Sequence, residues 1–187
     1  MFFDLDNYEE IQNAVIKIKS IQPNIDILIN NAGRPSGALF QMTSIKDLQQ
    51  TMNVNYFSQI VFTQGIVRLM IRNKKGSIIN ISSVSGIDGD PGTLSYGTSK
   101  AALISATKII SNEIGRYNIR INTIAPGPIM TEMLKKMDEK TKMSMISRSA
   151  LGKIGEASDV ANLALFLGSD LANHISGQVI RVDGGMS

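Results

Sequence analysis

The chain has 187 residues, which suits one domain, and 43% of them are hydrophobic, enough for a substantial core. Its net charge of +3 is too small to indicate a nucleic-acid-binding protein. With no cysteine and a single histidine, His174, it lacks disulfides and the usual ligands of a zinc site, so we expect no metal. No stretch approaches the roughly 18 apolar residues of a membrane helix, and the first residues lack a signal-peptide pattern. We therefore expect a cytoplasmic protein.

Helical and strand patterns alternate from the first residues to the last. A helical pattern around residues 11–18 precedes a β-branched run at 25–29, and a long helix over 45–72 precedes a strand at 77–81. A helix over 98–116 precedes a strand at 119–124, and a helix over 158–168, with Ser158 as N-cap, precedes a strand at 178–182. This alternation predicts an α/β fold with a Rossmann-like, doubly wound parallel sheet. Ligands of such sheets bind beyond the carboxyl ends of the strands.

One segment, residues 128–150, is rich in methionine. It holds half of the ten methionines of the chain, namely Met130, Met133, Met137, Met143 and Met145. Methionine is flexible and polarizable, which suits an adaptable apolar surface. We interpret this segment as a mobile substrate lid. The alternative is a pair of amphipathic helices that pack on a neighbour.

Tyr96 and Lys100 are the first candidates for chemistry. They stand four residues apart at the start of a helical pattern, so they share one helix face. A phenol has a pKa near 10, and a nearby ammonium favours the phenolate and lowers that pKa. The pair is therefore a candidate acid/base, although this spacing alone occurs often by chance.

Two polar residues elsewhere in the chain complete the candidate set. Ser83 ends the strand at 77–81 and precedes Tyr96, and its hydroxyl could bond a substrate carbonyl oxygen. A serine that only satisfies strand-end backbone groups is the alternative, which applies better to Ser82 and Ser85. Asn55 lies in the helix predicted over 45–72, where a buried amide is costly unless bonded. It could hold a water beside Lys100, or it could be a capping or core asparagine.

Taken together, these residues resemble the short-chain dehydrogenase/reductase family. The matching motifs occur in the order and at the spacings of that family, from about residue 3 to the C-terminus. Its 3-oxoacyl-[acyl-carrier-protein] reductase branch is the most similar, although sugar, steroid and small-alcohol dehydrogenases share the same sequence motifs. The motifs are Asn30-Asn31-Ala32-Gly33, Asn55, Ser83, Tyr96-Gly97-Thr98-Ser99-Lys100, Pro126-Gly127-Pro128-Ile129-Met130-Thr131 and Val182-Asp183-Gly184-Gly185.

The resemblance implies NAD(P)H-dependent reduction of a carbonyl, such as a 3-oxoacyl thioester of fatty acid biosynthesis, to a secondary alcohol. Tyr96 would donate the proton, Ser83 would orient the substrate oxygen, Lys100 would lower the Tyr96 pKa and bind the nicotinamide ribose, and Asn55 would anchor a relay water. The cofactor would be NADP or NAD, with NADPH favoured. The residues expected to contact it are Asp4, Leu5, Asn31, Ala32, Gly33, Tyr96, Lys100, Pro126, Gly127, Ile129 and Thr131.

One part of the family pattern is missing from this sequence. The family begins with a strand, a G-x-x-x-G-x-G turn and a helix whose N-terminus receives the pyrophosphate. This sequence starts near the third strand of the family, at residues 2–5. We expect residues 1–187 to form a single partial Rossmann-type domain, truncated at its N-terminus by about two βα units, with the methionine-rich lid at 128–150. An apolar sheet edge would then be exposed.

Two functional hypotheses follow. One is the reductase; the other is a truncated, cofactor-free remnant that acts as a binding or assembly partner or is inactive. For the reductase we expect a small-molecule or acyl-thioester substrate and no nucleic acid or membrane partner. An acyl carrier protein could bind Lys74, Lys75 and Arg116. We also expect a homo-oligomer, a tetramer or dimer, built through the helices at 45–72 and 98–116 and the strand at 178–182.

Overall fold

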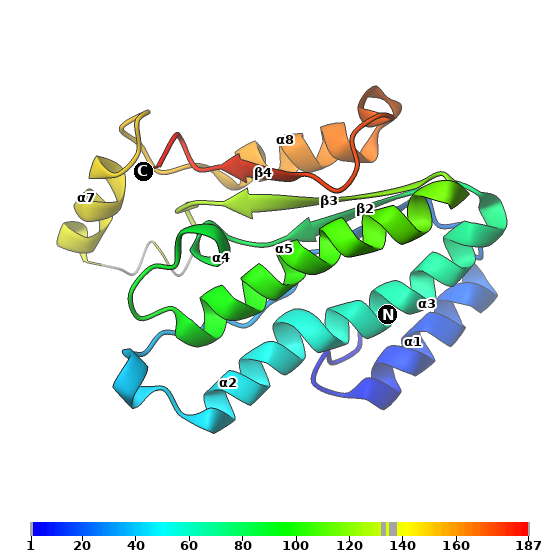
Figure 1. The fold of residues 1–187 in the computed structure, drawn as a ribbon, viewed down its shortest axis with the longest axis horizontal. Coiled ribbons are helices and arrows are strands. Elements are labelled where there is room, and N and C mark those ends of the chain that lie inside the picture. Colours follow the sequence, from blue (N-terminus) through cyan, green and yellow to red (C-terminus); the bar gives the residue numbers. More distant parts are fainter. Residues whose placement is uncertain (1, 132–133, 135–137, 187) are drawn as a thin grey trace.

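The computed structural model describes residues 2–131, 134 and 138–186. Its centre is a parallel sheet of four strands in the order β1-β2-β3-β4 (Figure 1). The strands are β1 (Ile27–Asn30), β2 (Gly76–Ile81), β3 (Ile119–Pro126) and β4 (Val179–Val182). All four lie where the apolar runs predict them, within two residues at each end.

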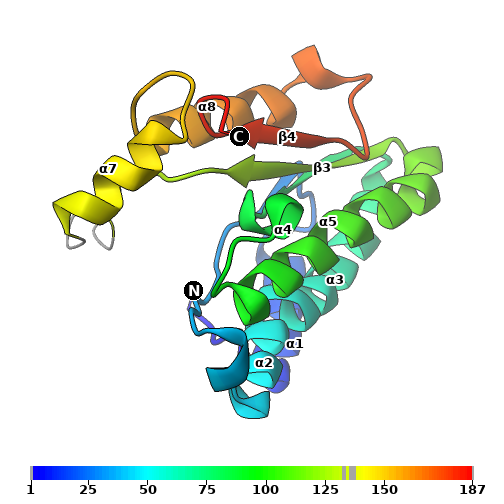
Figure 2. The same ribbon diagram turned by 60° about the vertical axis from the view of Figure 1, so that its left-hand side comes forward.

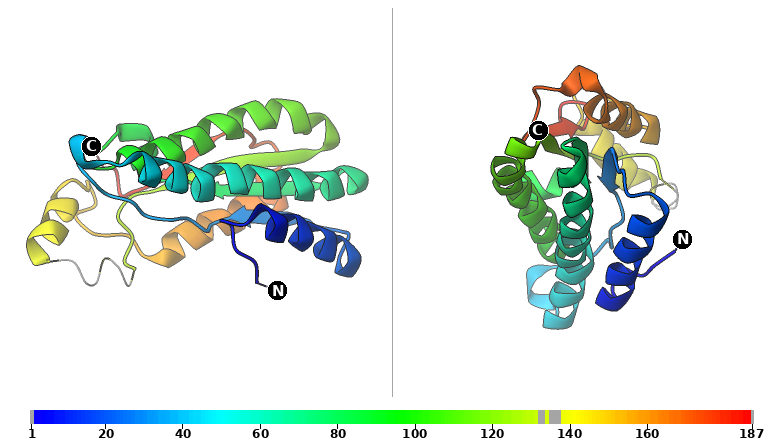
Figure 3. Two further views of the ribbon diagram at one scale, coloured as in Figure 1. Left: turned by 90° about the horizontal axis from the view of Figure 1, so that it is seen from below. Right: turned by 90° about the vertical axis from the view of Figure 1, so that its right-hand side faces the viewer.

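Helices cover both faces of this sheet, which confirms the doubly wound α/β architecture. The helices α3 (Ser58–Asn73) and α5 (Leu94–Ile114) lie on one face, and α8 (Ala157–Gly168) lies on the other (Figure 2). The first helix, α1 (Tyr8–Ile21), packs against α3. Figure 3 shows the same layers from two further sides.

The alternation of side chains along the strands explains the two cores. Ile78 and Ile121 point into a cluster with α3 and α5, whereas Ile79 and Ile124 point into a cluster with α8. All four are fully buried. Successive residues of a strand face opposite sides, so a continuous isoleucine run serves both layers.

The long helix predicted over 45–72 is interrupted. It consists of α2 (Ile45–Met52), a π-helical turn η2 (Asn53–Phe57) and α3. Single π turns inside helices often occur at functional sites, and this one contains Asn55. The expected N-cap Ser158 is wrong, because α8 begins earlier, with Glu156 at the cap and its backbone N–H donating to Asp159 at 2.8 Å.

The remaining elements are short. They are η1 (Phe40–Met42), α4 (Ser85–Asp88), η3 (Gly115–Tyr117), α7 (Glu139–Ser147) and η4 (Asp170–Ala172). Of these, α4 and α7 lie near the carboxyl ends of the strands and border the site described below.

A row of buried polar side chains crosses the sheet. Asn30, Asn80 and Thr123 are register partners on β1, β2 and β3. The Asn30 amide donates to Asn80 at 2.8 Å, the Asn80 amide donates to Thr107 at 2.8 Å, and the Thr123 hydroxyl donates to Thr107 at 2.7 Å. Because any other register would leave these groups unpaired in the core, the row fixes the alignment of the three strands.

Residues 2–5, near which the family has its third strand, form no strand in this structure. This segment is irregular, because an extended segment needs a hydrogen-bonded neighbour to form a ladder. Phe3 instead packs against Phe62 of α3, with ring centroids 5.1 Å apart and the ring planes tilted by 37°.

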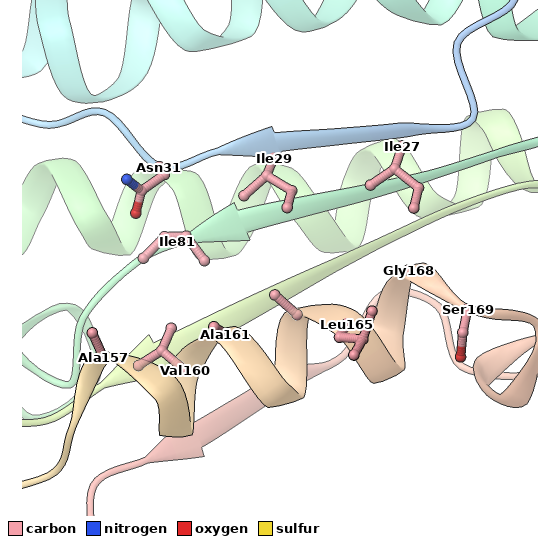
Figure 4. Close-up of a pocket in the computed structure, with 11 residues that line it drawn as sticks. Ile27, Ile29, Asn31, Ile81, Ala157, Val160, Ala161, Leu165, Gly168 and Ser169 are labelled. Carbon is pink, nitrogen blue, oxygen red and sulfur yellow. The ribbon is translucent and has the colours of Figure 1, made fainter.

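The edge strand β1 leaves one apolar face open. Ile27 and Ile29 are about half exposed and line a groove of about 550 Å³ together with residues of α8, among them Ala161 and Leu165 (Figure 4). The exposed apolar edge that the sequence predicts is therefore present.

Candidate active site

A cavity of about 710 Å³ lies at the carboxyl ends of the central strands. Residues that follow β2 and β3 form it, together with the start of α5 and the end of α7. Seven of the residues predicted for the site line it, namely Asn31, Ser83, Tyr96, Pro126, Gly127, Ile129 and Thr131. The structure thus brings together residues that lie up to 100 positions apart in the sequence.

Ser83 is held by an extension of the sheet beyond β2. The Ser82 N–H donates to Ile124 O at 2.8 Å and the Val84 N–H donates to Pro126 O at 3.0 Å, so Ser83 stands between two anchored residues. Its hydroxyl accepts from Ser85 N–H at 3.2 Å. Ser82 has the structural role expected of it, since its hydroxyl donates to Lys100 O at 2.9 Å.

Tyr96 lies in the first turn of α5 and points into the cavity. Burial raises the pKa of its phenol above the ordinary value of 10, and a hydrogen bond with Ser83 opposes that rise. Tyr96 is therefore protonated at neutral pH and can act as a proton donor. The Ser83 contact places the donor beside the hydroxyl expected to bind a carbonyl oxygen.

Lys100 lies one turn further along α5 and is 3% exposed. Its ammonium donates to Ile81 O at 2.8 Å and lies 5.8 Å from the centroid of the Tyr96 ring. Burial lowers the pKa of Lys100 from 10.5 to about 8. The expectation that Lys100 lowers the pKa of Tyr96 is not met in this structure, because burial of the phenol dominates and the ammonium lies against the ring.

Asn55 is fully buried in η2 and its amide is already bonded. Its nitrogen donates to Arg34 O and to the Ser99 hydroxyl, both at 3.0 Å, and its oxygen accepts from Arg34 N–H at 2.7 Å. The side chain thus fastens the loop after β1 to α5. The relay water stays a prediction, because these contacts use both donors of the amide.

The residues expected at the cofactor fall into two groups. Leu5, Asn31 and Ala32 line a second cavity of about 280 Å³ beside Phe62. The carboxylate of Asp4 does not line it; it accepts from Asp6 N–H at 2.9 Å. Gly33 lies under Lys100, where a Cβ atom would come within 3.3 Å of the ammonium nitrogen. Pro126, Gly127, Ile129 and Thr131 line the larger cavity with Tyr96.

These surroundings fit part of a nicotinamide dinucleotide. The buried Lys100 ammonium has three donors, and Ile81 O takes one of them, so hydroxyls of a ribose could accept others. In the wall of the smaller cavity, Gln59 Oε1 is buried without a partner. No strand in the described part leads through a glycine-rich turn into a helix N-terminus, the usual cradle of a pyrophosphate.

Sequence reasoning misses several residues that the structure places at the site. Ser99 bridges Asn55 and the backbone of Tyr96, because its hydroxyl donates to Tyr96 O at 2.7 Å. Asp90 and Arg148 line the cavity and form an ion pair at 3.0 Å. The polar position of Ser99 inside the Tyr-to-Lys motif is a usable signal. No local sequence signal predicts the Asp90–Arg148 pair, because its two residues lie 58 positions apart.

The methionine-rich segment is described only in part. Met133 and Met137 lie outside the described residues, whereas Met145 of α7 lines the cavity and Met143 is 70% exposed. The lid stays a prediction. Within the described residues, no group of three or more acidic, histidine or cysteine side chains could hold a metal ion, and no helix has the length and apolar character to cross a membrane.

Known proteins resemble this chain over nearly its whole length. A family model described as "Enoyl-(Acyl carrier protein) reductase" matches residues 1–187. The 3-oxoacyl-[acyl-carrier-protein] reductase FabG of Thermotoga maritima is 41% identical over 178 residues, which are 95% of this chain and 72% of that protein.

Two solved structures extend the likeness to three dimensions. The structure described as "ElxO with NADP Bound" has a TM-score of 0.91 and 33% identity, covering 97% of this chain and 75% of its own. An Agrobacterium tumefaciens protein has a TM-score of 0.95 and 26% identity, covering 98% and 74%. The motifs, the geometry and these matches agree: the chain belongs to the short-chain dehydrogenase/reductase family and is related to the FabG reductases.

Proposed function

We propose that this chain reduces a carbonyl group to a secondary alcohol with NADPH or NADH, and that Tyr96 donates the proton. The observation that carries the proposal is the arrangement of three side chains. Ser83 and Tyr96 lie in the wall of one cavity, and the Lys100 ammonium lies 5.8 Å from the centroid of the Tyr96 ring. A protonated phenol beside a second hydroxyl is suited to receive a carbonyl oxygen.

Each residue has a separate task in the proposed reaction. A reduced nicotinamide, when bound, supplies the hydride that reaches the carbonyl carbon. The Ser83 hydroxyl donates a hydrogen bond to the carbonyl oxygen and stabilises its developing negative charge. Tyr96 gives its phenolic proton to that oxygen, which completes the alcohol. Lys100 donates hydrogen bonds to the ribose hydroxyls and holds the cofactor beside Tyr96.

The substrate that we favour is a 3-oxoacyl thioester, and the cofactor is NADPH. The FabG name of the Thermotoga relative supports the first choice, and the NADP bound to ElxO supports the second. A cytoplasmic location fits both.

The carrier protein and the oligomer are further proposals. The cations expected to bind an acyl carrier protein, Lys74, Lys75 and Arg116, are exposed and cluster at the amino ends of β2 and β3, where Asn118 donates to Lys74 O at 3.2 Å. The cavity lies at the opposite ends of these strands. A carrier bound there would therefore serve another copy of the chain. Half-exposed Phe57 and Ile109 support a helical interface, and Leu171 and Val179 support one at β4.

Titration with NADPH and measurement of its consumption test the reductase. We expect the Tyr96→Phe variant to keep its fold and lose at least about a hundredfold in turnover, the usual worth of a positioned proton donor. Circular dichroism serves as the control for folding. Equal turnover in the variant and the unmodified chain would refute the role of Tyr96.

The second candidate is a cofactor-free binding or assembly partner. The lack of a phosphate cradle in the described part favours it, and so does the open apolar groove beside β1. NADPH titration separates the two functions, since only the reductase requires binding of the dinucleotide.

A further inference from the structure

The described wall of the proposed substrate cavity contains one ion pair. Among the described residues that line the cavity, Asp90 and Arg148 are the only charged ones. Their side chains are 26% and 40% exposed, and Arg148 Nη1 lies 3.0 Å from Asp90 Oδ1. The rest of the wall beside Ser83 and Tyr96 is largely apolar and includes Leu134 and Met145.

Local structure fixes both partners in place. Asp90 starts the turn Asp90-Pro91-Gly92-Thr93, in which Asp90 O accepts from Thr93 N–H at 3.2 Å and Gly92 has a φ of +79°. Arg148 ends α7, and the next residue, Ser149, is tied to Gly184 O at 3.2 Å. The pair thus joins two anchored segments across one side of the cavity.

A second cluster beside the pair adds negative charge. Arg181 of β4 forms a bidentate salt bridge with Asp88 of α4, at 2.7 and 2.8 Å. It also donates a hydrogen bond to Asp183. Arg181 and, at longer range, Arg148 hold the pKa of Asp88 below its ordinary value, so this carboxylate is charged. Among the described residues of this cluster and the pair, three carboxylates (Asp88, Asp90 and Asp183) accompany two guanidinium groups (Arg148 and Arg181), an excess of one negative charge.

We propose that the Asp90–Arg148 pair is a specificity determinant that makes the cavity select neutral carbonyl substrates and reject those with a free carboxylate. The inference rests on the proposed carbonyl reduction and adds a substrate class to it. With Asp90 in place, Arg148 is already neutralised and a substrate carboxylate meets the acidic excess. Without Asp90, Arg148 is free to bind that carboxylate.

Two probes that differ only in the group at C6 test the proposal. They are the diethyl ester of 3-oxoadipic acid, which is neutral, and its 1-monoethyl ester, which has a free carboxylate at C6. For the unmodified chain, Asp90→Asn and Arg148→Gln, the ratio of the two Kd values is measured by NMR titration and the ratio of the two kcat/KM values by NADPH consumption. A folding defect would weaken binding and turnover of both probes alike, so it would leave each ratio unchanged.

We expect the unmodified chain to prefer the diester by about fivefold, the upper end of the effect of one partly exposed charge. Asp90→Asn should bring the ratio of Kd values close to one, and Arg148→Gln should widen it. The control Asp26→Asn, which removes the same charge from an exposed residue at the amino end of the sheet, should leave it unchanged.

The outcomes separate the two proposals. A ratio in Asp90→Asn within twofold of the unmodified value overturns the specificity proposal, and so does failure of both probes to bind. A ratio that shifts as expected without any NADPH consumption supports the specificity and counts against reductase activity of this chain.

Discussion

Burial sets the protonation of the two titratable groups at the site. It raises the pKa of Tyr96, which keeps the phenol a proton donor at neutral pH, and it lowers the pKa of Lys100 to about 8. A donor of this kind suits reduction of a carbonyl better than oxidation of an alcohol, which needs the tyrosinate as a base. The surroundings of Tyr96 therefore favour the protonated form, which the proposed reduction uses.

Burial of the Lys100 ammonium lowers the free energy of unfolding, and this effect can be measured. The fall of its pKa from 10.5 to about 8 corresponds to roughly 3 kcal/mol, at 1.36 kcal/mol for each pH unit. Lys100→Met removes this penalty but leaves Ile81 O without its partner. We expect the free energy of unfolding at pH 7 to rise by about 1–2 kcal/mol, and turnover to be lost. Urea unfolding measures the first and NADPH consumption the second.

The control is the pH dependence of the difference in free energy of unfolding between Lys100→Met and the unmodified protein. Between pH 8 and 10.5 the unfolded chain binds more protons at Lys100 than the folded chain, so the stability of the unmodified protein rises with pH in this window. The advantage of Lys100→Met is full below pH 8 and shrinks toward pH 10.5. A variant that is less stable than the unmodified protein at pH 7 would contradict the assignment of the penalty to burial.

Among the elements, the contact between α4 and α5 positions Ser83, Tyr96 and Lys100 relative to each other. Gly86 of α4 lies so close to α5 that a Cβ atom would stand 2.8 Å from Ala101 N and 2.9 Å from the Lys100 carbonyl carbon. Gly97 of α5 meets the backbone of Ser85 just as closely, at 2.8 Å. Two glycines thus allow α4, which follows Ser83, to lie directly on the turn that holds Tyr96 and Lys100.

Gly86→Ala tests the importance of this contact. The added methyl group meets backbone, which cannot rotate away, so α4 must shift; we expect a loss of about 1–3 kcal/mol in stability and a lower kcat/KM. The matched control is Gly115→Ala, because a Cβ atom at Gly115 would meet nothing within 4 Å. Thermal unfolding and NADPH consumption of the two variants give the comparison. Equal effects of both substitutions would show that the close approach of α4 and α5 is unimportant.

How far the sequence predicts this molecule depends on whether a pattern is local. The isoleucine runs locate all four strands, and the Tyr96-to-Lys100 spacing locates two groups of the site, because both signals lie within one element. The pairing of Asn30 with Asn80, and of Asp90 with Arg148, joins residues 50 and 58 positions apart, and no local pattern contains it. The N-cap of α8 is missed for a different reason: Glu156 competes with Ser158 for the same helix start.

At the scale of the whole molecule, the sheet has one poorly protected side. The edge strand β1 and α8 leave an apolar groove of about 550 Å³, where Ile27 and Ile29 are about half exposed and Leu165 is 75% exposed. An uncovered apolar edge favours pairing with another chain. The chain also spans only 72% of the length of its Thermotoga relative.

The groove predicts self-association, and one substitution tests it. Ile29→Thr removes apolar area from the groove and keeps a residue that favours strands. We expect analytical ultracentrifugation to show a lower mass average for this variant than for the unmodified chain. The control, Ile16→Thr on α1, removes a comparably exposed isoleucine outside the groove and should change nothing. An unchanged mass average for Ile29→Thr would remove the groove as the cause of any association.

The open side of the sheet predicts a marginally stable domain. The lack of a phosphate-binding turn among the described residues predicts weak binding of NADPH. In the proposed complex the dinucleotide would contact Lys100 and the cavity around Asn31, but the described residues include no glycine-rich helix start for its pyrophosphate. The charged centre of the ligand therefore lacks the donors that usually hold it. We expect a broad thermal transition and a Kd for NADPH well above the micromolar range, measured by calorimetry and by fluorescence titration. A sharp, cooperative transition together with micromolar binding would contradict this expectation, because it would require that the described surfaces alone complete both the core and the dinucleotide site.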